Sequence, residues 1–122
     1  MTHVIKVHKK EQYLSVVTDG VVDVRYLTGM GKEFVQKERE TGIRRVLIDI
    51  RKSRIKANLI DAFTYTSNSS IPILPGEKNA VLILPKSPDA IKARIYSLQS
   101  MFSGLHVRVF EDEAEAMEWL LL

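Results

Sequence analysis

Two short apolar segments in the middle of the chain place the tightest limit on how it can fold. They are residues 45–50 (RVLIDI) and 80–84 (AVLIL). Nearly continuous apolar strands of this length are typical of the central strands of a parallel sheet, which are covered on both faces. Parallel strands need a crossover connection, and a helix usually supplies it. The two segments therefore predict an α/β fold.

Three further segments have the composition of strands. Residues 4–7 and 13–17 are rich in β-branched side chains and are separated by polar residues, so they predict an antiparallel hairpin. Residues 107–110 (VRVF) predict a last strand, which comes just before an acidic helix start. Together with the central strands, these segments predict a mixed, mainly parallel sheet of four or five strands.

The segment that follows residue 17 fits two structures. Asp19-Gly20 lies between apolar residues, as in a tight hairpin turn, which would make residues 21–27 the returning strand. Alternatively, Asp23 caps a helix, although two glycines within that helix weaken it by about 1 kcal/mol each relative to alanine. The apolar residues of the helix would recur at steps of three and four: Leu27, Met30 and Phe34. We favour the helix from about Asp23.

Four helices are expected to cover the sheet. The apolar stripe of the first would end at Glu38, and Gly42 is suited to terminate the helix. The others are expected over residues 58–67, from Ser87 to about residue 103, and from Asp112 to the end of the sequence. The predicted order is β-β-α-β-α-β-α-β-α within one domain that spans residues 1–122, since no segment has the composition of a linker.

The composition excludes several classes of protein. The chain has no cysteine, which excludes disulfides and thiolate metal sites, and no apolar run near the roughly 20 residues of a membrane span. The spacing of its histidines predicts no metal site, and no cofactor is expected. A net charge of +3 without a concentrated basic face does not predict a nucleic-acid partner. No long apolar signal stretch is present, so we expect a cytoplasmic protein.

The order of these elements, with the residues that they contain, resembles the STAS superfamily and its SpoIIAA-like members, the bacterial anti-sigma-factor antagonists. Residues 17–23 (VTDGVVD) look like that family's strand, glycine and acidic helix start, which favours the helix after Gly20. Residues 45–50 look like its central strand. Residues 107–120 (VRVFEDEAEAMEWL) look like the subgroup that is described as STAS/SEC14-like. The resemblance covers nearly the whole chain and implies a regulatory protein.

The phosphorylation site of the family is not matched. Antagonists of the SpoIIAA type carry an Asp-Ser pair at the start of the helix after the central strand, and a partner kinase phosphorylates the serine. The corresponding positions here are about Ala57 and Asn58, and neither side chain has a hydroxyl group. The usual serine switch is therefore not expected. Ser53 lies nearby, but not at the matching position.

A basic segment, residues 51–56 (RKSRIK), is the main candidate for a binding site. We expect it to form a loop beyond the carboxyl end of the central strand, at the edge where open α/β sheets bind their ligands. A helix that begins just after it would add its positive dipole end. The segment predicts a site for an anion or an acidic partner, formed by Arg51, Lys52, Ser53, Arg54 and Asn58.

These observations predict a non-enzymatic regulatory or protein-interaction module, because no catalytic constellation or nucleophile elbow is recognisable. A protein partner is expected, and the apolar last helix is also compatible with a homodimer. The alternative follows from the SEC14-like resemblance: a small apolar or lipid-like ligand, held in a pocket of at least roughly 300 Å³. Its walls would lie near Phe63 and Phe102.

Overall fold

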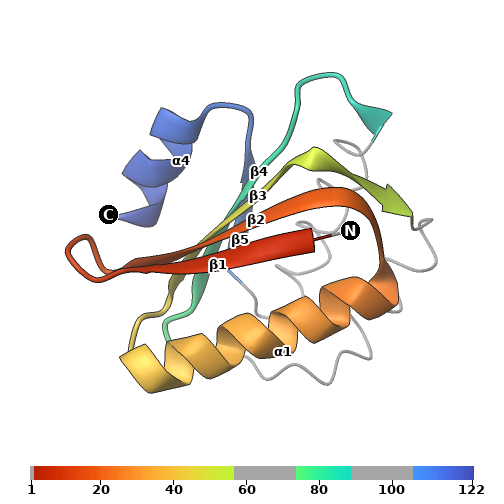
Figure 1. The fold of residues 1–122 in the computed structure, drawn as a ribbon. Coiled ribbons are helices and arrows are strands. Elements are labelled where there is room, and N and C mark those ends of the chain that lie inside the picture. The colour runs from red at the N-terminus through yellow and green to blue at the C-terminus, as the bar shows by residue number, and fades with distance from the viewer. Residues whose placement is uncertain (1, 57–73, 89–105) are drawn as a thin grey trace.

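The computed structural model describes residues 2–56, 74–88 and 106–122, which form a mixed sheet of five strands with a helix on each face (Figure 1). The spatial order is β1-β2-β3-β4-β5; β1 is antiparallel to β2, and all other neighbours are parallel. The elements are β1 (Thr2–His8), β2 (Tyr13–Asp23), α1 (Val24–Thr41), β3 (Arg45–Lys56), β4 (Lys78–Leu82), β5 (Val107–Phe110) and α4 (Glu113–Leu120).

The α/β class, the mixed sheet and the leading hairpin are therefore confirmed, whereas the expected number of about four helices is not supported. Two of the expected helices, α1 and α4, are present. The segments expected to form the other two, residues 58–67 and from Ser87 to about 103, lie almost entirely outside the described residues. The central strand expected over residues 80–84 is also displaced, because β4 begins at Lys78 and ends at Leu82.

The two helices bury different faces of the sheet (Figure 1). Below the sheet in that view, α1 packs on the first strands through one apolar cluster: Leu14, Val16, Met30, Phe34, Val35, Ile43 and Val46. On the opposite face α4 packs through a second cluster: Leu47, Ala80, Leu82, Phe110, Ala116 and Leu120. Neighbouring residues of β3, Val46 and Leu47, belong to different clusters because successive side chains of a strand point to opposite faces.

The helix alternative after residue 17 is confirmed. Strand β2 continues through Asp19-Gly20 instead of turning back, and α1 begins directly after it. Asp23 is the N-cap: its Oδ1 accepts a hydrogen bond from the Tyr26 amide at 2.8 Å. The hairpin signal of Asp-Gly is overridden because residues 19–23 pair with the far half of β3. Gly20 keeps a positive φ of 97° within the strand.

The structure corrects the expected basic loop. Residues 51–56 continue β3 as a strand that pairs with the end of β2. A bulge in β3 bends the strand where this extension begins. Val17 pairs with Asp49 and Asp19 with Lys52, so β3 has one more residue than β2 between these pairs. Basic composition alone suggested a loop, whereas the alternation of buried and exposed residues is that of a strand.

The end of α1 gives a test of the backbone geometry. Gly42 terminates the helix with a φ of 76°, and its amide donates to the Glu38 carbonyl at 2.9 Å. A Cβ at Gly42 would meet no atom within 4 Å, and neither would one at Gly29 in the helix interior. We therefore expect Gly42→Ala to lower the free energy of unfolding by about 1 kcal/mol through backbone strain alone. Gly29→Ala should raise it by about 0.5–1 kcal/mol.

Urea unfolding, followed by far-UV circular dichroism, measures both effects. Each substitution adds the same methyl group in open space, so the opposite signs isolate the left-handed conformation at Gly42. Two changes of the same sign would contradict it.

Candidate functional site: the distal ribbon of β2 and β3

The candidate site is a two-stranded extension of the sheet, which we call the distal ribbon: residues 19–23 of β2 paired with residues 52–56 of β3. The registered pairs include Asp19 with Lys52, Val21 with Arg54, and Asp23 with Lys56. The last pairs that β1 and β4 make with these strands involve Asp19 and Asp49. The ribbon therefore continues beyond its neighbouring strands, and Figure 1 shows β2 and β3 curving away at this end.

One face of the ribbon combines charged side chains with an apolar one. Because residues alternate along a strand, and registered residues of parallel strands share a face, six side chains lie on the same side. We call this set the ribbon face; all of its members are exposed: Asp19, Val21, Asp23, Lys52, Arg54 and Lys56. Val21 is 53% exposed between the two strands' charged residues. The ribbon face is thus a row of cations beside a row of two carboxylates, with an apolar centre.

The other side of the ribbon is buried around a pair of hydroxyl groups. Ser53 is only 9% exposed, and its hydroxyl donates to the Thr18 hydroxyl at 2.6 Å. The Thr18 hydroxyl in turn donates to the Asp49 carbonyl at 3.4 Å. This chain of hydrogen bonds crosses the bulge and satisfies polar groups that lie away from water. Ser53 therefore does not belong to the exposed side of the ribbon.

Arg51 lies at the bulge and is committed to an internal ion pair. Its guanidinium donates to both carboxylate oxygens of Asp49, at 2.9 and 2.7 Å, and lies 3.9 Å from the Glu113 carboxylate. Burial alone would raise the pKa of Asp49, but the hydrogen bonds and the charge of Arg51 hold that pKa below its usual value. Arg51 therefore joins β3 to the first turn of α4. The two carboxylates beside it largely offset its positive charge.

The five residues predicted to form one site are thus separated by the structure. Lys52 and Arg54 lie on the ribbon face, Ser53 is buried beneath it, and Arg51 is paired with Asp49. Asn58 lies outside the described residues, as do Ala57, Phe63 and Phe102. Sequence reasoning missed the contribution of β2 (Asp19, Val21 and Asp23), because it depends on the register between two strands.

A chain of polar side chains that the sequence did not predict joins β1 to α1. His3 Nε2 lies 2.6 Å from the Glu33 carboxylate, and His3 Nδ1 is hydrogen-bonded to the Tyr26 hydroxyl. Such a Tyr-His-Glu series could suggest a catalytic relay. However, burial and the charge of Glu33 raise the pKa of Tyr26, which opposes formation of a phenolate nucleophile. We interpret the series as a structural connection between strand and helix.

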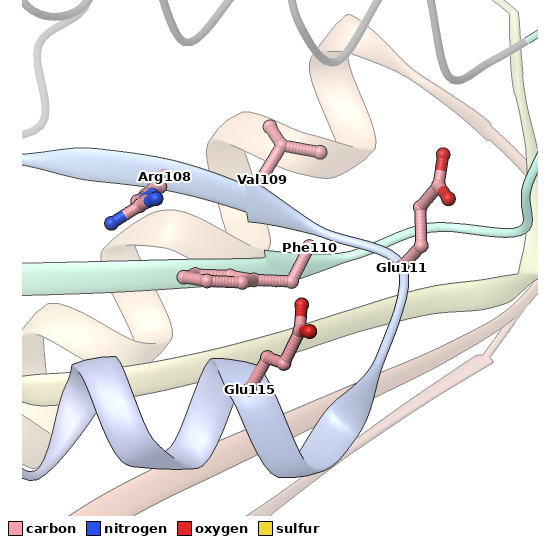
Figure 2. Close-up of a pocket in the computed structure, with 5 residues that line it drawn as sticks. All are labelled: Arg108, Val109, Phe110, Glu111 and Glu115. Carbon is pink, nitrogen blue, oxygen red and sulfur yellow. The ribbon is translucent and has the colours of Figure 1, made fainter.

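A shallow groove of about 240 Å³ lies on the other edge of the sheet, between β5 and α4 (Figure 2). Its lining is mostly polar: Arg108, Val109, Phe110, Glu111 and Glu115. The Arg108 guanidinium lies over the Phe110 ring, 5.3 Å from its centre. Two carboxylates and a guanidinium do not match the apolar pocket that a lipid-like ligand requires.

The described residues give no sign of a metal centre or a membrane span. No group of three or more histidine, cysteine, aspartate or glutamate residues in residues 2–56, 74–88 and 106–122 is arranged to hold a metal ion. Within the same ranges, no helix has the length and apolar character needed to cross a membrane.

Comparison with known proteins identifies the fold but no activity. No protein-family model matches the chain, and no curated protein matches it. A solved structure does: an uncharacterized protein of the DUF3478 family with a SpoIIAA-like fold, from Shewanella loihica PV-4. The match covers 98% of this chain and 92% of the other, with a TM-score of 0.56 and 19% sequence identity. The chain therefore has a SpoIIAA-like fold, as the resemblance implied; identity this low shows the fold alone.

Substitutions at neighbouring positions of β3 test the assignment of its two sides. We expect Ser53→Ala to lower the free energy of unfolding by about 1 kcal/mol, because one buried hydrogen bond is lost. Ser53→Asp should lower it by about 3 kcal/mol or more, because a carboxylate is forced into a buried position. Lys52→Ala, one residue away but exposed, should change it by less than about 0.5 kcal/mol. Chemical denaturation measures all three, and a Ser53→Asp variant as stable as the Lys52 variant would show that Ser53 is not buried.

Proposed function

We propose that this protein is a non-enzymatic regulatory module that binds a protein partner through the ribbon face. The observation that carries the proposal is the exposure of Val21 among charges of both signs. Apolar groups surrounded by polar ones are common in protein interfaces, where complementary charges fix the register of the partner. We further propose that the protein acts in the cytoplasm. We also propose that it works without a serine switch, since Ser53 is buried and Asn58 has no hydroxyl group.

The register of the ribbon favours a protein over a small anion. Lys52 and Lys56 each have an aspartate as their cross-strand neighbour, and Arg51 is paired with Asp49. A phosphate or similar anion would meet these carboxylates as well as the cations. A partner protein, in contrast, can place acidic groups over the β3 row and a basic group over the β2 row. The apolar-ligand alternative stays a prediction, because Phe63 and Phe102 lie outside the described residues.

Site-specific photocrosslinking in cells that express the protein tests the proposal. A benzophenone amino acid at Val21 would report on the ribbon face, and the same probe at Val4 is a matched control, because both valines are 53% exposed. We expect a discrete crosslinked partner from position 21 and none from position 4. Adding Lys52→Glu and Arg54→Glu should reduce the yield at least about tenfold, the loss expected when two charge pairs at an interface are reversed.

A charge-matched control separates this effect from net charge. Lys9→Glu with Lys10→Glu changes the net charge equally, but in the exposed turn between β1 and β2. This variant should retain the crosslink. Equal crosslinking from positions 4 and 21, or equal losses in both double variants, would refute binding through the ribbon face.

A further inference from the structure

A pair of buried carboxyl groups joins the end of α1 to the start of β4. Glu38, in the last turns of α1, is 0% exposed, and neither of its carboxyl oxygens has a donor among the described residues. Glu77, just before β4, is also buried; one oxygen accepts from Asn79 Nδ2 at 3.0 Å, and the other has no donor in the same part of the chain. Buried oxygens without donors are rare in folded proteins and require an explanation.

The two groups meet at a junction of three elements. Glu38 follows Phe34 by four residues on the buried stripe of α1, at the position where the sequence predicted that the stripe ends. The Lys78 amide, next to Glu77, donates to the Arg44 carbonyl at 2.8 Å, and the Glu77 amide donates to the Leu74 carbonyl at 3.1 Å. The end of α1, the start of β3 and the start of β4 are therefore held together around the pair.

Two ionised carboxylates in this position would repel each other, and three of their four oxygens have no donor among the described residues. The Glu77 carboxyl acts on Glu38 both through its charge and through hydrogen bonding, and both effects raise the pKa of Glu38. One proton resolves the conflict, because a protonated carboxyl group donates to the other, as in other closely spaced carboxyl pairs. Burial first, and then the charge and hydrogen bonding of Glu77, raise the pKa of Glu38 from 4.5 to about 8; the Arg44 charge opposes the rise.

We propose that Glu38 and Glu77 share one proton and act as a pH-sensitive latch, which holds α1 against the start of β4 while the proton is bound. Loss of the proton leaves two facing carboxylates, whose repulsion loosens the junction. The latch is independent of the ribbon face, because neither carboxyl group belongs to that surface. Failure of the crosslinking experiment would therefore leave this inference intact, and the reverse also holds.

The surrounding charges favour a proton over a metal ion. Arg44 lies close enough to lower the pKa of Glu38, and its guanidinium donates to the carbonyls of Glu38 and Ile43. Its positive charge offsets the single negative charge that remains on a protonated pair. Lys78 does not take part, because its ammonium group donates to the Trp119 carbonyl on the other face of the sheet. Asn79 is neutral. A divalent cation bound between the carboxylates would, together with Arg44, leave the site with a net positive charge.

The sign of the pH dependence follows from the raised pKa. The native protein keeps a proton that the unfolded chain loses above about pH 4.5, so the stabilising contribution of the pair is fully present below that pH and is lost as the pH rises to about 8. Between these values the equilibrium constant for unfolding should rise by up to about tenfold per pH unit from this pair. Glu38→Gln keeps the shape of the side chain and supplies an amide donor to Glu77, so this part of the dependence should disappear.

Urea unfolding at a series of pH values measures the effect, with Glu40→Gln as the matched control, since Glu40 is on the same helix but exposed. We expect the slope to flatten in Glu38→Gln and to persist in Glu40→Gln. If Glu38→Gln does not fold, Glu77→Gln removes the charge of Glu77 and offers Glu38 an amide donor, so the slope should become shallower, while burial of Glu38 keeps part of it. A wild-type slope that persists in the Glu38 or Glu77 variant would overturn the latch.

Two direct readouts complete the test. The carboxyl carbon of Glu38, followed by NMR, should titrate near pH 8, and a midpoint near its ordinary value of 4.5 would exclude the shared proton. Hydrogen exchange at the Gly42 amide, which donates to the backbone carbonyl of Glu38, should accelerate at alkaline pH beyond the intrinsic base dependence. The Ala116 amide in α4 should show only the intrinsic dependence.

Stabilisation of the wild type, but not of Glu38→Gln, by Ca²⁺ or Mg²⁺ would mean that the pair holds a cation, and would also overturn the proposal.

Discussion

The parallel pairing of β2 with β3 is the constraint on which the other features depend. It runs from Leu14 and Val46 to Asp23 and Lys56, the longest strand contact in the described residues. Its first half lies in the buried sheet between α1 and α4, and its second half forms the distal ribbon. The bulge between the halves explains why the same two strands provide both a core and an exposed surface. One inserted residue moves Arg51 toward Asp49 and returns Ser53 to the buried side.

The polar groups near this pairing fall into two sets: buried or half-buried groups that pair with one another, and charged groups that stay exposed. Ser53 and Thr18 satisfy each other beneath the ribbon, and Asp49 is neutralised by Arg51. The charges that remain exposed on the ribbon face come from alternate positions of two strands, so the register decides which of them are neighbours. A one-residue shift in register would place each cation opposite a different neighbour and turn the apolar Val21 to the other side. Any recognition by this surface therefore depends on the accuracy of the strand pairing below it.

Much of the architecture could be predicted from local pattern. The apolar segment at residues 45–50, the cap at Asp23 and the stop at Gly42 are properties of short stretches of sequence, and the structure agrees with them. The far half of β3 could not be predicted in this way, since its basic composition resembles a loop and only its pairing with β2 makes it a strand. The same limit applies to Glu38: helical spacing predicted the end of an apolar stripe there, but whether a carboxyl group is buried depends on a partner 39 residues later, Glu77.

Asp23 belongs to two features at once, and this gives the ribbon face a connection to the helix. Its side chain is on the ribbon face, and its carboxylate also caps α1 by accepting the Tyr26 amide. A basic group on the proposed partner would compete with that amide for the same oxygens. Capping interactions of this kind contribute about 1 kcal/mol. A partner that draws the carboxylate away must bind more weakly by that amount, and by thermodynamic reciprocity it frays the first turn of α1. Binding of such a partner and order in the first turn of α1 would thus be energetically coupled through one side chain.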